Sequence, residues 1–563
     1  MSSHQRASTS RFSKTLSVTV VLGLLVASLH VGVASIYIDH PPHYDEMYHM
    51  LAAESWRASG ELRILDGEYR RAALFTKLVG LYFGICGPSL ECARWMSVAA
   101  SALLVMLVTV FSGILMRPAV GFVAGVLVAI NPAVIVASQM VRFYSLHALS
   151  FFVFASLLFV LFAFWYRLSN GKVIASAVLG TAALAFANHL HVVLTRLGAL
   201  AAVIGIMALL VPELYKWFRR QAIWVIVLTT IAALGAAALF VSWFDFLAII
   251  ERLRTAPLWA QGLEHQYLYY HRNLLLWYAA LWPLLPILAL LAIARWPKLS
   301  LYSLVIFLLA FLVLSVAVAK ADRFLLFALP FLAIPMAAGV VSLLQLLVEF
   351  LQRNLEHSTG WTPRASSAAA VLLVLGALVP YAGTQHVTRS LAQMVLDSEY
   401  VRMFGNYGAY ADWAYAATRL SELASDYPII LSSSGVKAAY YLGDFSFELN
   451  GSVVRETDSK IEFGMDRRTG RQVVSNAQSI HRIREECGAL LVIVEDVHFN
   501  DEGTLAFLDE VGNRIEVVPN MWVWTVEDRQ GGTPVGHEPG DEWPAVKCRG
   551  LSRTGATSNA QDD

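Results

Sequence analysis

The sequence predicts a polytopic α-helical membrane protein with about eleven transmembrane helices and a C-terminal soluble α/β domain. Of the 563 residues, 57% are hydrophobic and only 15% are charged, whereas about a quarter of an ordinary soluble protein is charged. Charged residues are sparse before about residue 385 and return after Arg389. The formal net charge is zero, which excludes the strong basic field of a nucleic-acid-binding protein.

Eleven apolar runs have about the 20 residues that a helix needs to cross a bilayer. They cover residues 15–37, 94–116, 118–138, 146–166, 173–189, 192–211, 222–244, 274–294, 300–319, 324–347 and 367–384. Several contain Gly, Ala or Ser, which suits close helix packing in lipid.

Basic residues precede the first run and then occupy every second loop. They are Arg6, Arg11, Lys14, Arg117, Arg167, Lys172, Lys216, Arg219, Arg220, Arg295, Lys298, Arg353 and Arg364. By the positive-inside rule these loops and the N-terminus face the cytoplasm, so residues 385–563 are predicted on the periplasmic or extracellular side of the cell membrane. An alternative is that the first run is a cleaved signal peptide, with small residues at Val33-Ala34-Ser35.

The segment 385–563 alternates helix-like and strand-like patterns, which predicts a small α/β layer structure. Helices are expected at 408–425 and 504–511, and strands at 428–432, 489–495 and, as an edge strand, 521–527. The tail from about residue 530 is predicted to be disordered. We find no phosphate-binding glycine loop, metal-ligand cluster or nucleophile elbow in this segment, so acceptor recognition or support of a lid is its expected role.

Four cysteines occur in two regions, Cys86 and Cys92 in the first loop and Cys487 and Cys548 in the soluble domain. Four cysteines allow three pairings, and only one joins cysteines of the same region. Both regions are predicted to face an oxidising side, so these two disulfides can form. Free, buried cysteines are the alternative.

Ionisable residues gather in loops on the non-cytoplasmic side. The loop 38–93 begins an amphipathic helix with Asp45-Glu46, and Asp45 and His49 are four residues apart on one face. A second amphipathic segment, about 71–85, includes Lys77 and follows Arg70. Such helices lie in the membrane interface, so the pattern brings carboxylates and cations together where water meets lipid headgroups.

Transfer of a sugar from a lipid phosphate requires this combination of groups. A carboxylate takes the proton of the attacking hydroxyl, and cations stabilise the phosphate that leaves. The alternative is that Asp45 and Glu46 cap the helix while the cations bind lipid headgroups.

Three stretches of the sequence carry a family resemblance. The first comprises Asp45-Glu46, Tyr48, Gly60, Gly67-Glu68-Tyr69, Arg70-Arg71, Ala72-Ala73-Leu74 and Arg94. The others are Ser138 to Leu146 (SQMVRFYSL) and Lys320 to Pro330 (KADRFLLFALP). Together they resemble polyprenyl-phosphate-sugar-dependent glycosyltransferases of the GT-C fold, glycosyltransferase family 39 and its relatives, which include protein O-mannosyltransferases and lipid A aminoarabinose transferases. Ala72-Ala73 replaces the usual Pro-Pro, and Phe324 replaces a common Tyr.

The resemblance implies an inverting transferase. Asp45 would be the general base, with Glu46 beside it. An undecaprenyl- or dolichyl-phosphate sugar would meet Arg71 and Arg323 through its phosphate, with Arg142, Lys320 and Lys77 as further candidates. The acceptor would be a hydroxyl on a lipid, glycan or protein. Candidate substrate-binding residues are Tyr48, Tyr69, Arg70, Tyr144, His189, His191 and Tyr269.

Some of these assignments have alternatives. His189 and His191 suit an interfacial helix end as well as a sugar or phosphate contact, and Tyr269 belongs to an aromatic and basic cluster, residues 265–272, that also suits an interfacial belt. No cofactor is firmly predicted; a divalent metal at Asp45, Glu46 and His49 stays open, although two adjacent acids make a poor cage.

Two other functions compete with the transferase. A lipid-linked sugar flippase would place its charges at mid-span in discontinuous helices. A scaffold would use its membrane part only as an anchor, which does not need eleven spans.

Overall fold

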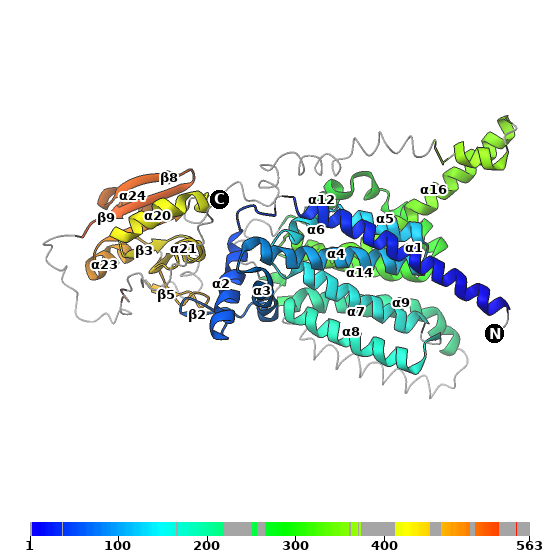
Figure 1. Cartoon of the computed structure of the whole chain (residues 1–563), viewed down its shortest axis with the longest axis horizontal. Coiled ribbons are helices and arrows are strands. Elements are labelled where there is room, and N and C mark those ends of the chain that lie inside the picture. Colours follow the sequence, from blue (N-terminus) through cyan, green and yellow to red (C-terminus); the bar gives the residue numbers. More distant parts are fainter. Residues whose placement is uncertain are drawn as a thin grey trace. The chain divides into compact units, whose positions relative to one another are not determined.

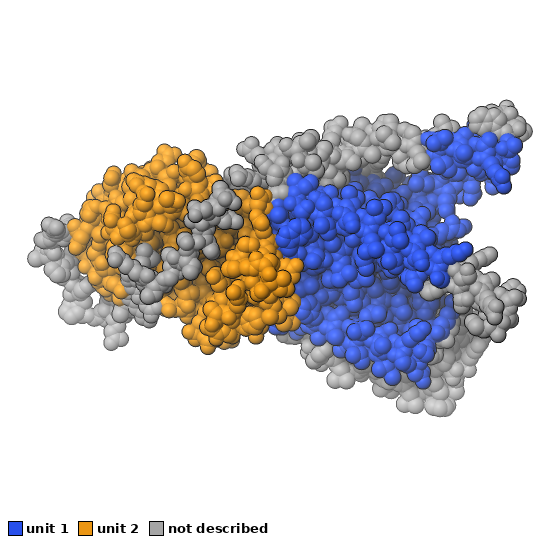
Figure 2. Space-filling view, viewed as in Figure 1, with its two compact units in different colours: residues 1–38, 94–139, 143–398 blue, residues 39–93, 140–142, 399–563 orange. Residues whose placement is uncertain are grey.

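We describe the protein from a computed structural model of the whole chain. It describes residues 3–36, 38–164, 167–218, 250–251, 253–255, 265–359, 362–369, 371–372, 411–450, 463–474, 476–495, 502–528, 546 and 548. The chain divides into two compact units (Figure 2). Unit 1 contains residues 1–38, 94–139 and 143–398, and unit 2 contains residues 39–93, 140–142 and 399–563. The loop 39–93, which the sequence analysis placed with the membrane part, thus forms one unit with the soluble domain.

Unit 1 is a bundle of apolar helices, labelled in Figure 1. Its helices are α1 (Ser3–Ala34), α4 (Leu90–Leu115), α5 (Pro118–Ala129), α6 (Pro132–Ser138), α7 (Tyr144–Phe164), α8 (Asn170–Leu190), α9 (Val192–Phe218), α12 (Tyr269–Tyr278), α13 (Leu285–Arg295), α14 (Pro297–Val316), α15 (Asp322–Leu325) and α16 (Leu329–Thr359). Within the described residues, seven helices are long and apolar enough to cross a membrane, or eight if α5 and α6 form one bent span. The chain is therefore a polytopic integral membrane protein.

Two expected spans are not continuous helices. The run 118–138 bends by 64° between α5 and α6, where Pro132 begins α6 and the Asn131 side chain accepts hydrogen bonds from the first backbone N–H groups. The run 274–294 was predicted as one helix, and this is wrong. α12 ends at Tyr278, and α13 begins only at Leu285. Pro283 cannot donate to the carbonyl four residues earlier and clashes with it, which stops the helix.

The expected spans 222–244 and most of 367–384 lie outside the described residues. The other expected spans correspond to α1, α4, α7, α8, α9 and α14. The last of them corresponds to a helical segment from Asp322 to Leu355, which contains α15 and most of α16. Close backbone packing occurs between α4 and α5, where a Cβ added at Gly121 would lie 2.7 Å from the Cα of Gly113. Small residues let membrane helices approach in this way.

Unit 2 contains a seven-stranded sheet in the order β5-β6-β4-β3-β7-β9-β8. The strands are β3 (Ile429–Ser432), β4 (Phe447–Leu449), β5 (Phe463–Met465), β6 (Gln472–Val474), β7 (Leu490–Glu495), β8 (Asn513–Val518) and β9 (Met521–Val526). The four strands from β6 to β7 are parallel, and the outer ones pair antiparallel. The α/β prediction is confirmed, but the edge position of 521–527 is wrong, because β8 follows β9 at that edge.

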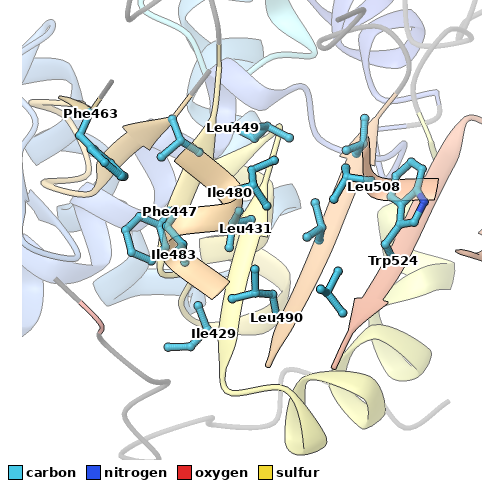
Figure 3. Close-up of a cluster of buried hydrophobic side chains, with 14 residues drawn as sticks. Ile429, Leu431, Phe447, Leu449, Phe463, Ile480, Ile483, Leu490, Leu508 and Trp524 are labelled. Carbon is cyan, nitrogen blue, oxygen red and sulfur yellow. The ribbon is translucent and has the colours of Figure 1, made fainter. Parts of the chain in front are cut away.

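Helices cover both faces of this sheet. Figure 3 shows Ile480 and Ile483 of α23 (Ala477–Cys487) and Leu508 of α24 (Glu502–Val511) beside apolar strand residues in one core cluster. On the other face, α20 (Trp413–Asp426) and α21 (Gly435–Leu442) join a second cluster with Ile430, Leu491 and Val523. Burial on both faces explains why β7 is an unbroken apolar run up to its final Glu495.

The first loop packs onto the soluble domain within unit 2. It forms α2 (Tyr44–Ser59), the hairpin β1 (Arg63–Ile64) and β2 (Gly67–Glu68), and α3 (Ala73–Cys86). The Asp66 N–H donates to the Thr469 carbonyl at 3.1 Å, and Arg471 pairs with Asp66 at 2.7 Å. A Cβ added at Gly67 would collide with the Arg468 backbone, so glycine is required there. These contacts fix the loop that carries the acidic pair.

Both predicted disulfides form. Cys86–Cys92 and Cys487–Cys548 have Cα separations of 5.9 and 5.4 Å, within the usual range for a disulfide.

The predicted disordered tail from about residue 530 lies outside the described residues, apart from Val546 and Cys548.

A buried carboxyl in unit 2 makes the stability depend on pH. Burial, and then the Asp466 carboxylate, raise the pKa of Glu448 on β4 to about 7, although the Arg468 guanidinium opposes the shift. A folded pKa above the unfolded value means that the folded state holds this proton more tightly. Stability from Glu448 is therefore present below about pH 4.5 and is lost as the pH rises through 7.

We predict that Glu448→Gln, which mimics the protonated acid, raises the melting temperature of the soluble domain at pH 8 and changes it little at pH 5. Thermal unfolding of the full chain, followed by tryptophan fluorescence, measures this difference. An equal effect at both pH values would contradict the buried-acid explanation.

Candidate active site

The acidic pair lies in the first turn of α2, whose start is fixed by a capping box. The His43 Nδ1 accepts a hydrogen bond from the Asp45 N–H at 3.2 Å, and Glu46 Oε2 accepts one from the His43 N–H at 2.7 Å. Such reciprocal bonds satisfy backbone donors that a helix start leaves unpaired. The capping role that the sequence left open is thus confirmed for Glu46.

Glu46 also fixes a distant segment of the chain. Its other oxygen, Oε1, accepts a hydrogen bond from the Val141 N–H at 2.7 Å, and the residue is fully buried. Both carboxylate oxygens therefore hold backbone N–H groups. This arrangement locks the segment 140–142 against the start of α2 and suits a positioning role for Glu46.

Asp45 is held by cations rather than by the helix cap. Its Oδ2 forms a direct ion pair with Arg142, whose side chain is only 2% exposed. Its Oδ1 lies 3.8 Å from Arg71, whose side chain is 52% exposed. A buried ion pair whose partner is removed is strongly destabilised, so Arg142 holds the carboxylate in one orientation. Arg71 also pairs with this carboxylate but is half-exposed.

His49, on the same face of α2 as Asp45, belongs to the packed interior. It hydrogen-bonds the Thr76 hydroxyl at 2.8 Å and lies 3.3 Å from the Tyr69 hydroxyl. Burial, and then the Arg71 charge, lower the pKa of His49 to about 3. Among the described residues, no group of three or more His, Cys, Asp or Glu side chains is arranged to hold a metal. Asp45, Glu46 and His49 each have other partners.

The remaining candidates in unit 2 contact residues other than Asp45. Tyr48 and Tyr69 stack with ring centroids 5.7 Å apart in a buried cluster. Arg70 pairs with Glu68 at 2.5 Å on the surface. The Nζ of Lys77 lies 6.0 Å from the centroid of the Trp56 ring. Tyr48 and Tyr69 therefore pack in the interior of unit 2.

A second cationic group lies in unit 1, in the turn between α14 and α16. The guanidinium of Arg323 lies 5.9 Å from the centroid of the Tyr144 ring. The Nζ of Lys320 lies 5.9 Å from the centroid of the Tyr267 ring. Lys320 is buried and donates to the Ala317 carbonyl at 2.6 Å. The motifs SQMVRFYSL and KADRFLLFALP, far apart in sequence, thus meet at Tyr144 and Arg323.

The aromatic segment 265–272 holds this turn in place. The Tyr270 hydroxyl donates to the Ala321 carbonyl at 3.1 Å, and Asn273 donates to Asp322 at 2.5 Å. Burial, and then the charge of Asp322, raise the pKa of Tyr269. The segment therefore does more than form an interfacial belt. Sequence reasoning missed Asn273 and Asp322, although Asp322 lies inside the quoted motif.

The two candidate histidines are differently placed. The His191 ring lies 5.9 Å from the Phe143 ring and 6.2 Å from the Phe324 ring, measured between centroids, so it joins the aromatic surroundings of Tyr144 and Arg323. His189 is in the exposed last turn of α8. The structure thus brings His191 into contact with the aromatic residues of these motifs.

Comparison with known proteins shows the fold. No protein-family model matches the sequence, and no curated protein matches it. Among solved structures, ArnT from Cupriavidus metallidurans bound to undecaprenyl phosphate is similar with a TM-score of 0.59 and 14% identity, covering 90% of this chain and 97% of that one. The oligosaccharyltransferase AglB from Archaeoglobus fulgidus, in complex with an inhibitory peptide and a dolichol-phosphate, is similar with a TM-score of 0.52 and 12% identity, covering 92% and 75%. The chain therefore has the GT-C fold, as the sequence motifs predicted.

Proposed function

We propose that the protein is an inverting membrane glycosyltransferase that moves a sugar from a polyprenyl phosphate to an acceptor hydroxyl on the outer face of the membrane. The proposal depends on the surroundings of the Asp45 carboxylate. Buried Arg142 holds this carboxylate in one orientation, and half-exposed Arg71 lies beside it. Two proteins of the same fold were solved with undecaprenyl phosphate and with a dolichol-phosphate, which supports a lipid-linked donor of this kind.

Asp45 acts as the general base in this mechanism. The acceptor oxygen attacks the anomeric carbon from the face opposite the phosphate, and its proton passes to the Asp45 carboxylate. As the new carbon–oxygen bond forms, the bond from the anomeric carbon to the phosphate oxygen breaks, and the polyprenyl phosphate leaves with the electron pair. The anomeric configuration is inverted because a single displacement occurs.

Cations stabilise the phosphate as its charge develops. Arg71 and Arg323 are assigned to it, because each guanidinium offers a planar pair of donors to phosphate oxygens. Lys320 is buried beside the same turn as Arg323 and adds a positive charge. Arg142, which the family resemblance offered as a phosphate ligand, is instead assigned to orient Asp45.

The flippase alternative receives less support. It would place ionisable groups at mid-span, whereas Asp45 lies in the first turn of α2 and Arg323 lies in a four-residue helix between α14 and α16. Groups at helix ends suit a reaction at the membrane surface.

The basic loops and the two disulfides support a cytoplasmic N-terminus and an outer soluble domain. We predict that an alkaline phosphatase fused after Asp563 is active, whereas a green fluorescent protein fused there is dark. The opposite pair of results would place the reaction on the cytoplasmic face.

The role of Asp45 predicts a specific kinetic defect. Asp45→Asn should lower turnover by about 10²–10⁴-fold and leave donor affinity nearly unchanged, since a base acts as the proton leaves. Arg323→Ala should weaken donor binding as well, because its phosphate contact already exists in the ground state. Turnover and donor affinity are measured together in nanodiscs.

Glu46→Gln is the matched control, since it alters the neighbouring acid but keeps one carbonyl acceptor for a backbone N–H. We expect a milder loss than for Asp45→Asn. Near-normal turnover in Asp45→Asn would remove its role as the base. If Glu46→Gln were then inactive, the base would be Glu46, and if neither change mattered the flippase would be favoured.

A further inference from the structure

Unit 2 contains a pocket beside the start of α2. The centre of a water-sized molecule can occupy about 70 Å³ of it, and the pocket is partly open to solvent. The first loop contributes His43 and Tyr44 to the lining, and the soluble domain contributes Asp412, Trp413, Lys437 and Tyr441. The pocket thus joins residues adjacent to Asp45 in sequence with the helices α20 and α21.

The sheet topology independently predicts a ligand site at this place. β3 lies between β4 and β7 in the sheet. From β3 the chain first builds β4 and β6 on one side. It then returns through α23 and adds β7 on the other side of β3. Such a switch in direction opens a crevice at the carboxyl ends of the two parallel strands, where ligands of α/β sheets bind. Glu495, the last residue of β7, lies at this end.

Glu495 holds two of the pocket residues. Both of its carboxylate oxygens accept from the Lys437 Nζ, at 2.6 and 2.8 Å, and Oε2 accepts from the Trp413 indole N–H at 3.3 Å. Glu495 is fully buried and Lys437 is 3% exposed. Buried charges of this kind are costly unless well paired, so the pair fixes the pocket wall in one arrangement.

The lining combines aromatic pairs with charged groups. His43 and Tyr44 have ring centroids 4.2 Å apart, and Trp413 and Tyr441 form a nearly parallel pair at 6.2 Å and 21°. Asp412 and Lys437 add charged groups to the same lining. A sugar ring matches this chemistry, because its C–H bonds form apolar faces and its hydroxyls donate and accept hydrogen bonds at the edges.

We propose that this pocket binds a saccharide portion of the acceptor. The inference rests on the proposed transferase function and adds the chemical class of the second substrate. A lipid chain would add no hydrogen bond to the polar groups of this lining, whereas the hydroxyls of a saccharide can. A peptide cannot extend the sheet here, because β3 and β7 are both paired on each side.

The pocket also lies next to the general base. The Nδ1 of His43 is 3.7 Å from Asp45 Oδ2, so a residue that lines the pocket contacts the carboxylate. A saccharide bound in this pocket can therefore present a hydroxyl toward Asp45, which takes the proton in the transfer.

The test measures saccharide binding by the full chain in nanodiscs. An array of neutral and amino-sugar mono- and disaccharides is screened first, and the affinity of the strongest is then determined for variants. We expect Tyr441→Ala and Tyr44→Ala each to weaken binding roughly threefold to tenfold, the contribution of one aromatic contact. Tyr415→Ala, on α20 and 79% exposed but outside the pocket lining, is the matched control and should change affinity less than twofold.

Binding by no saccharide on the array would overturn the inference. So would an equal loss in Tyr415→Ala, or a serine-containing peptide that binds with the same dependence on Tyr441 and Tyr44. Asp45→Asn separates the two proposals, because it should abolish transfer while saccharide binding stays intact. If saccharides bind as expected but the wild-type protein transfers sugar to none of them, the transferase function fails and the binding site stands.

Discussion

The ion pair between Asp45 and Arg142 is the constraint on which the candidate site depends. Arg142 is almost fully buried, and a buried guanidinium without a partner costs several kcal/mol (roughly 3–5). The chain must therefore bring the segment 140–142 to the start of α2. Glu46 completes this attachment through the Val141 N–H, so two adjacent acids fix one short segment and leave Asp45 in a defined orientation.

The soluble domain supports this arrangement from the other side of the first loop. The hairpin 63–68 is hydrogen-bonded to the segment 466–471, and Arg471 joins Asp66 of the loop to Asp444 of the domain. α2 and α21 share a buried cluster that contains Tyr48 and Val436. The proposed general base must be held rigidly to be effective, and these contacts hold the loop that carries it.

Local features of this structure could be predicted from the sequence, and long-range pairings could not. The apolar runs, the start of α2 at Asp45-Glu46 and the buried strand β7 all follow from local composition and spacing. The disulfides were expected from the grouping of the cysteines in two regions that are both predicted to face an oxidising side. The pairing of Asp45 with Arg142, 97 residues away, has no local signal, and the family resemblance offered Arg142 as a further candidate for the donor phosphate. Pro283 is a local signal for the break before α13, but the long apolar run around it led to the prediction of one continuous helix. The inner position of β9 depends on its pairing with β8, a strand that the sequence analysis did not predict.

The most direct test of the account is a double-mutant cycle with Asp45→Asn and Arg142→Gln, in which turnover is measured in nanodiscs. If Arg142 acts only by orienting Asp45, its removal can do no further harm once the carboxylate is gone. The double variant should then be about as slow as Asp45→Asn alone, a strongly non-additive result. Losses that multiply across the two sites would contradict the account, because Arg142 would then act on the substrate independently, as a ligand of the donor phosphate.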